Sequence, residues 1–357
     1  MSKYKSRISK LSQFLDQNQA LLLSTPTDIV YLTGFNHLVP EERESFLLIT
    51  PNTNIFFHTS FSPFGSPAGV NVRKSCSLNK ISDEIKKLNQ ENGLKELLVD
   101  KSNLFVSEYE TLSKFSFLKL ASFDRQHIWK IRTIKDDQEI ISLKKAADIT
   151  SQAIASSIKS LQVGMTEIQL KEIIESELKK AGSEKPAFPT IVAFGPNSAL
   201  PHHQPTTTVL EEEMPVLIDL GAVIDGYNGD MTRTVWFGKQ STAKFLKIEK
   251  IVKDAYKTTL ETLKNRGDGP ILAKDLDQVA RSVITKAGYG KNFIHTTGHG
   301  LGLDLHENLS LNWNNSQPIL SNMVITIEPG IYLKDEFGYR YENMILVTSD
   351  GAEELTY

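Results

Sequence analysis

The chain has little of what marks secreted, membrane-spanning or nucleic-acid-binding proteins. Its 357 residues include a single cysteine, Cys76, which excludes a disulfide framework within one chain and leads us to expect a reducing, cytoplasmic environment. The net charge of −3 offers no electrostatic attraction for nucleic acid or for an anionic membrane. No uninterrupted apolar stretch reaches the roughly 18 residues of a transmembrane helix. We therefore expect a soluble protein that binds neither nucleic acid nor membrane.

What the chain does contain is the composition of an ordinary globular protein, with 40% hydrophobic and 23% charged residues. At about 150 residues per domain, its length predicts two domains. Residues 1–129 alternate strand and helix signals, which is typical of a small α/β domain. The expected elements there are short strands at 20–24, 46–49 and 97–99 and an amphipathic helix at 78–92 that ends at Gly93.

Residues 130–357 show a repeated order of elements, two helices followed by strands. Thr166 and Gln169 form a capping-box pattern that begins the second helix. The first set is predicted at 135–161, 166–182, 188–194, 216–224 and 231–237, and the second at 242–265, 273–287, 323–333 and 341–347. Within 323–333, Pro329 is expected to stop the apolar strand directly after Glu328. This order predicts an α+β domain built of two related ααββ halves, with a ligand site between them.

Four carboxylates and one imidazole stand in or beside apolar, strand-like segments of this second domain. A carboxylate among Val, Ile and Leu is costly to bury unless its charge is paired. Oxygen ligands with one imidazole suit divalent metals. The candidate ligands are Asp219, Asp230, His299, Glu328 and Glu342. Asp225-Gly226 signals a turn that would bring the two aspartates together. A structural alternative has Asp219 capping a loop and Asp230 paired with Arg233.

Histidines supply a second group of candidates. His299 lies between Gly298 and Gly300 and is flanked by His295 and His306. The glycine spacing resembles a phosphate loop, but no strand–loop–helix context surrounds it; the glycines would instead let the backbone approach a crowded centre. His202 and His203 are adjacent, so we expect only one of them to face a site. A loop without function remains the alternative.

Six segments together carry a family resemblance, in the order and spacing that the family shows. They are GPNSALPH (195–202), IDLG (218–221), DMTRT (230–234), GHGLGLDLHE (298–307), IEPGIY (327–332) and RYE (340–342). With YLTGF (31–35) in the first domain, the chain resembles the proline-specific metallopeptidases, which include Xaa-Pro dipeptidase (prolidase) and Xaa-Pro aminopeptidase. The resemblance implies a creatinase/prolidase-like N-terminal domain, a pita-bread catalytic domain and a homodimer.

The resemblance also implies residue roles. Asp219, Asp230, His299, Glu328 and Glu342 would hold two divalent ions, manganese in the first place, with cobalt or zinc as alternatives. Glu328 would act as general base, and the histidines of the substrate site would be His202, His295 and His306. The substrates would be short peptides with proline at the second position.

Two departures from the family pattern bear on the substrate and on the surroundings of the metal. Asn343 follows Glu342 where the family often has aspartate. Residues 308–316 hold no arginine or lysine to bind a dipeptide's carboxylate, which leaves dipeptidase and aminopeptidase activity both open. A creatinase-like enzyme lacks these ligands, and methionine aminopeptidase lacks such an N-terminal domain. A catalytically inactive adaptor with the same fold is the alternative from another functional class.

Overall fold

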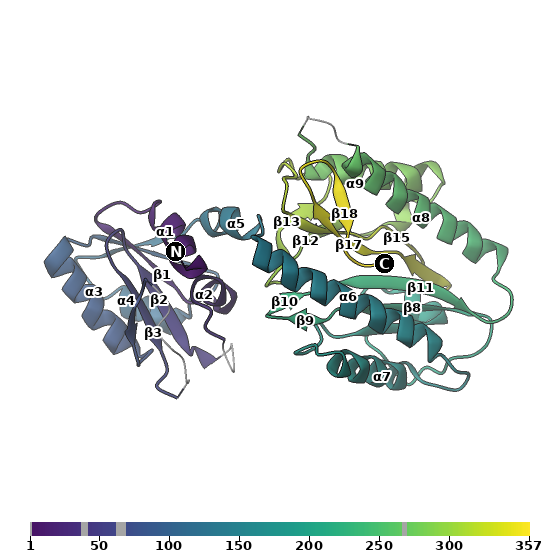
Figure 1. Ribbon diagram of the computed structural model, residues 1–357, viewed down its shortest axis with the longest axis horizontal. Coiled ribbons are helices and arrows are strands. Elements are labelled where there is room, and N and C mark those ends of the chain that lie inside the picture. Colours follow the sequence, from purple (N-terminus) through teal and green to yellow (C-terminus); the bar gives the residue numbers. More distant parts are fainter. Residues whose placement is uncertain (1, 37–41, 62–68, 266–269) are drawn as a thin grey trace. The chain divides into compact units, whose positions relative to one another are not determined.

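The computed structural model describes residues 2–36, 42–61, 69–265 and 270–357. The chain separates into two compact units, Met1–Arg132 and Thr133–Tyr357, which Figure 1 shows in purple to blue and in teal to yellow. None of the helices in these described ranges is long and apolar enough to cross a membrane.

The N-terminal unit is built on a mixed six-stranded sheet of order β4-β3-β2-β1-β5-β6. The strands are β1 (Gln19–Leu23), β2 (Ser45–Ile49), β3 (Asn54–His58), β4 (Asn71–Arg73), β5 (Glu96–Val99) and β6 (Lys119–Ser122). The helices are α1 (Lys3–Ser12), α2 (Pro26–Thr33), α3 (Leu78–Asn92), α4 (Val106–Leu112) and α5 (Gln126–Arg132). The helix predicted at 78–92 is confirmed, and Gly93 ends it in the left-handed conformation, at φ 65°, that glycine adopts without strain.

Asp28 is completely buried in this unit, and its carboxylate is paired. The Oδ1 atom of Asp28 lies 2.7 Å from Nη1 of Arg132 and its Oδ2 atom lies 2.9 Å from Nη1 of Arg125. Arg125 also pairs with Asp100. Two guanidinium groups therefore balance two carboxylates, as burial of charge requires.

The C-terminal unit confirms the repeated order of elements, as two helices and then strands in each half. The first half holds α6 (Asp137–Lys159), α7 (Glu167–Lys180), β7 (Ile191–Phe194), the 3₁₀ helix η2 (Gly195–Ala199), β8 (Met214–Leu220), β9 (Val223–Ile224), β10 (Tyr227–Asn228) and β11 (Met231–Phe237). The second half holds α8 (Ala243–Lys264), α9 (Ala273–Lys286), η3 (Gly290–Asn292), β12 (Gly298–Gly300), β13 (Glu307–Leu311), β14 (Val324–Ile327), β15 (Gly330–Leu333), β16 (Phe337–Arg340), β17 (Asn343–Val347) and β18 (Ala352–Glu354).

The two helices of each half pack on the sheet of that half, and α6 also packs against β14 and β17 of the second half. Apolar side chains of α6 and α7 meet β7, β8 and β11 in one core, and those of α8 and α9 meet β13, β14 and β17 in another. The sheets have the orders β11-β8-β7 and β13-β12-β14-β17-β18. Figure 1 shows α7 and the pair α8 and α9 on opposite outer sides of this unit, with the strands between them. The inner faces of the sheets are therefore left free to build a site.

The strand predicted at 323–333 stops before Pro329, as the proline predicts, but the segment does not stay in one sheet. The segment forms two strands that belong to different sheets, β14 in the large sheet and β15 in a hairpin with β16. Glu328 and Pro329 lie between them, and Pro329 has no N–H to continue a ladder. The hydrophobic pattern alone runs across this break, so it predicted neither the change of sheet nor the strand β16.

Candidate metal centre

The five candidate ligands come from five strands and their ends. Asp219 lies in β8 and His299 lies in β12, whereas Asp230 directly precedes β11, Glu328 directly follows β14 and Glu342 directly precedes β17. Antiparallel pairing of β8 with β11 and of β14 with β17 brings the carboxylates of each half to one end of its strand pair. All five side chains line one cavity of about 660 Å³.

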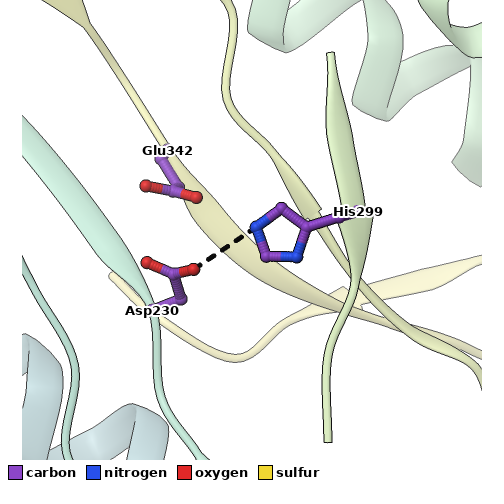
Figure 2. Close-up of side chains that lie close together, drawn as sticks. All are labelled: Asp230, His299 and Glu342. Atoms are coloured by element: carbon purple, nitrogen blue, oxygen red, sulfur yellow. Dashed lines mark ion pairs between the residues drawn. The ribbon is translucent and has the colours of Figure 1, made fainter. Parts of the chain in front are cut away.

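Three of these side chains approach one another most closely. Asp230, His299 and Glu342 are buried, and one possible ligand atom from each lies within 4.8 Å of the other two. Figure 2 shows the two carboxylates and the imidazole converging from three separate strands. Nε2 of His299 lies 3.5 Å from Oδ2 of Asp230 and 3.6 Å from Oε1 of Glu328. His299 thus lies close to three carboxylates.

Asp219 is held differently from the other carboxylates. Its Oδ2 atom accepts a hydrogen bond from Nη2 of Arg340, while its buried Oδ1 atom has no hydrogen-bond partner in the described part of the chain. Asp219 therefore does not cap a loop. Arg233 donates to the carbonyl of Glu342 at 2.7 Å and to Oδ1 of Asn343 at 2.8 Å. Arg233 thus does not serve as the partner that the structural alternative gave to Asp230.

The cluster carries more negative than positive charge. Burial, followed by the charges of Asp219 and Glu328, raises the pKa of Asp230 well above its ordinary value. Burial and the charge of Asp230 do the same to the pKa of Glu342. The pKa of Glu328 is also raised, chiefly by burial, although His299 and Arg340 oppose the rise. Four carboxylates thus face one guanidinium, an imbalance that bound divalent cations remove.

His295 lies in the cavity with both ring nitrogens engaged. Nδ1 donates to the carbonyl of Thr296 at 2.7 Å, and the hydroxyl of Tyr332 donates to Nε2 at 2.9 Å. That hydroxyl in turn accepts from Nη1 of Arg340 at 2.8 Å. Burial, and then the charge of Arg340, lowers the pKa of His295 to about 3. His295 is therefore a neutral, fixed imidazole.

His306 and His202 also line the cavity. The ring of His306 meets that of His299 edge to face, with centroids 4.3 Å apart, and burial followed by the charge of His299 lowers its pKa to about 4. His203 points elsewhere, because its Nε2 lies 2.8 Å from Oε2 of Glu167. The expectation that only one of the adjacent histidines faces a site agrees with this geometry.

Residues 142–349 match metallopeptidase family M24, and residues 7–134 match the creatinase/prolidase N-terminal domain. The chain belongs to metallopeptidase family M24. Among its relatives, an uncharacterized peptidase of Staphylococcus haemolyticus is 36% identical over 99% of each chain. A Xaa-Pro dipeptidase of Pyrococcus horikoshii is 33% identical over 98% of this chain and 96% of that protein. The predicted family is thereby confirmed.

Solved structures of family members have the same architecture. The prolidase from Pyrococcus horikoshii superimposes with a TM-score of 0.90 at 32% identity, covering 99% of this chain and 98% of that one. The X-Pro aminopeptidase from Thermotoga maritima superimposes with a TM-score of 0.85 at 30% identity, covering 98% and 97%. The predicted fold, a small α/β N-terminal domain followed by a pita-bread catalytic domain, is confirmed.

Membership of the M24 family implies divalent metal ions, and the donors of this chain fit them. The set consists of carboxylate oxygens and one imidazole nitrogen, which suits hard and borderline divalent metals. The buried, unpartnered Oδ1 atom of Asp219 is a donor position that a cation would satisfy. The raised pKa values of Asp230 and Glu342 show the same need for positive charge.

Two residues that support this M24 site were not predicted. In the sequence, Arg340 was identified as part of the RYE segment and given no role of its own. Its guanidinium nevertheless binds Asp219, Tyr332 and the hydroxyl of Thr232. That hydroxyl donates to Oε2 of Glu342 at 2.6 Å. The arginine two positions before Glu342 in an apolar stretch was the available signal, because a buried cation needs an anionic partner. The partner itself, 121 residues away, could not be inferred.

Proposed function

We propose that this M24 metallopeptidase is a metal-dependent exopeptidase that releases the N-terminal residue preceding proline. The observation that carries the proposal is the cavity shared by three buried carboxylates, the half-buried Glu328 and His299, in which Arg340 is the only arginine or lysine among the described lining residues and is bound to Asp219. The substrate class is supported by relatives and structural neighbours that are described as Xaa-Pro dipeptidase, prolidase and X-Pro aminopeptidase.

Five residues would hold the metal, two ions being the number that the resemblance implies. They are Asp219, Asp230, His299, Glu328 and Glu342, with manganese as the first candidate and cobalt or zinc as alternatives. When bound, a pair of divalent ions lowers the pKa of a water molecule and polarises the scissile carbonyl. The chain positions this set through Arg340, which orients Asp219, and Thr232, which orients Glu342.

Glu328 is the proposed general base. It lies directly after β14, between His299 and His295, with Oε1 3.6 Å from Nε2 of His299 and Oε2 3.9 Å from Nδ1 of His295. Its carboxylate takes the proton of the attacking water and returns it to the leaving nitrogen as the C–N bond breaks. That nitrogen belongs to proline and carries no hydrogen before cleavage, so the returned proton is what completes the leaving amine.

Two of the three histidines are proposed hydrogen-bond donors, and the third forms part of the cavity wall. His202 and His306 would donate hydrogen bonds to the carbonyl oxygen as negative charge develops on it. His295 already uses both nitrogens on Thr296 and Tyr332. Its part is therefore to shape the wall of the substrate site beside Glu328.

The cavity bears on the length of the peptide. Among its described lining residues, Arg340 is the only arginine or lysine, and Asp219 already engages it. A dipeptide's carboxylate therefore finds no free cationic side chain there. This favours peptides that continue beyond proline, whose carboxylate lies outside the cavity.

The test uses manganese-loaded protein with Ala-Pro, Ala-Pro-Ala and Ala-Ala-Ala, and measures release of free alanine. We expect release from Ala-Pro-Ala and not from Ala-Ala-Ala. Cleavage of Ala-Pro alone would establish a dipeptidase with a carboxylate-binding group outside these lining residues. Absence of cleavage of both proline peptides, in protein shown to contain metal, would overturn the proposal and favour the adaptor.

A further inference from the structure

The carboxylate of Glu167 is fully buried although it lies in the first turn of α7, a position usually open to solvent. The N-terminus of α7 does not need this carboxylate as a cap. Oγ1 of Thr166 accepts from the N–H of Gln169 at 3.2 Å, and the side chain of Gln169 accepts from the N–H of Thr166 at 2.8 Å, so the predicted capping box is confirmed and complete. The Glu167 side chain is thus available for another purpose.

Five donors surround this carboxylate, and all come from the segment 194–206. Oε1 accepts from the N–H of Phe194 at 2.8 Å and from Nδ2 of Asn197 at 2.9 Å. Oε2 accepts from Nε2 of His203, from the N–H of Thr206 and from the hydroxyl of Thr206, at 2.8, 2.8 and 2.7 Å. Glu167 therefore ties the end of β7 to the far end of the loop that follows it.

Ionisation of Glu167 is what makes these contacts strong. Burial alone would raise its pKa, but hydrogen bonds from His203 and Asn197 lead the contacts that hold the pKa below its ordinary value. A carboxylate accepts at both oxygens, whereas an amide accepts at one and donates at the other. Only the ionised acid can serve all five donors.

His202 lies inside the loop that Glu167 closes. Its own imidazole makes no hydrogen bond with any described residue, and it lines the cavity from an exposed position. Its two neighbours are fixed. His203 binds Glu167 at 2.8 Å, and the carbonyl of Pro201 accepts from Nη1 of Arg340 at 3.4 Å. The backbone at His202 is therefore held on both sides.

We infer that Glu167 is a positioning residue that aims His202 into the cavity. The inference rests on the proposed function, because it takes its importance from the role proposed for His202. Glu167 touches neither the candidate ligands nor the substrate cavity, so its effect on catalysis passes through the loop. Misplacement of a reacting group by about 1 Å can lower a rate by about 10²-fold.

The primary test compares Glu167→Gln with Glu172→Gln, an exposed glutamate on the same helix. We expect Glu167→Gln to increase hydrogen–deuterium exchange in residues 195–208 and to lower kcat/KM by about 10-fold to 10²-fold, with metal content unchanged. Glu172→Gln should match the wild type in all three measurements. Unchanged exchange and unchanged kcat/KM in Glu167→Gln would overturn the inference.

A double-mutant cycle separates positioning from general damage to the fold. If Glu167 acts through His202, Glu167→Gln adds little to the loss of kcat/KM already caused by His202→Ala. If Glu167→Gln lowers kcat/KM as much in the His202→Ala background as in the wild type, the inference about Glu167 is contradicted and the proposed function is not. Wild-type activity of His202→Ala contradicts instead the role proposed for His202. Should Glu167→Gln fail to fold, Thr206→Val removes one of the five donors and is run through the same cycle, where equal penalties in both backgrounds overturn the inference.

Discussion

The two units of this protein bury carboxylates in opposite ways. In the N-terminal unit, Asp28 is fully buried and Arg132 and Arg125 lie on its two oxygens. In the C-terminal unit, Asp230, Glu328 and Glu342 share one cavity, where Arg340 is the only arginine or lysine among the described lining residues and is bound to Asp219. In the first arrangement the carboxylate is balanced by arginines of the chain itself, whereas in the second the carboxylates need a bound cation.

The difference shows how structural and functional charges can be told apart. A buried ion pair in which each charge has its partner needs no added ligand, and removal of one partner is costly. Burial raises the pKa of Asp230 and of Glu342, and neighbouring carboxylates raise it further; perturbed pKa values of this kind cluster at functional sites. Four experiments sharpen or break this comparison.

The largest effect is expected for Glu328→Gln. The amide keeps the size of the side chain but cannot take the proton of the attacking water, so activity on the proline tripeptide should fall by roughly 10²- to 10⁴-fold. Circular dichroism and the unfolding temperature should show a folded protein. Glu353→Gln, at an exposed glutamate that pairs with Lys144, is the control. Substantial activity in Glu328→Gln would remove Glu328 as the base.

The N-terminal unit should respond to Asp28→Asn through stability instead. Asparagine removes the carboxylate charge that lies 2.7 Å from Nη1 of the buried Arg132, and breaking a buried ion pair costs about 3–5 kcal/mol. Hydrogen exchange of the amides of β1 and β5, followed in increasing urea, measures this cost within the unit. Asp83→Asn, at an exposed aspartate of α3, should change little. A cost near zero for Asp28→Asn would mean that the ion pair is not what fixes this unit.

Metal removal should act on the C-terminal unit alone. Chelation withdraws the cations that the carboxylates need, and return of manganese at 100 times its dissociation constant should stabilise the unit by about 2.7 kcal/mol. The measurement is the hydrogen exchange of β8 and β14 with and without metal, and β1 serves as the internal control. Equal exchange of β8 and β14 in both states would contradict a metal site among these strands.

The smallest effect concerns Glu167 and pH. Its folded-state pKa is lowered, so its contribution to stability is present above the unfolded-state pKa of about 4.3 and is lost as pH falls through the folded-state value. At neutral pH the wild type should exceed Glu167→Gln in stability by about 1–3 kcal/mol, the cost of unsatisfied buried donors. Unfolding curves between pH 3 and 7 measure this margin. If the stability difference between the wild type and Glu167→Gln grows as the pH falls, the prediction is contradicted.

Local features of this protein were largely predictable from its sequence. The α3 helix with its terminal Gly93, the capping box of Thr166 and Gln169 and the strand β11 at 231–237 all occur where the pattern placed them. These features depend on neighbours within a few residues, so the sequence contains their whole cause. The change of sheet between β14 and β15 was missed because apolar residues lie on both sides of Pro329, and only the pairing partners distinguish the two sheets.

The types of side chain at the candidate site were also readable in the sequence, because carboxylates in apolar strands are costly to bury unless a cation pairs with them. Which of these side chains pair with one another could not be inferred from the sequence. The approach of Asp230, His299 and Glu342 to one another, the guanidinium of Arg340 on Asp219 and the five donors around Glu167 each join segments that are far apart in the chain. The sequence by itself determined which groups this protein has available for chemistry. Only the tertiary structure decided which of them are paired and which remain for a metal, since that depends on distances between strands and not on residue types.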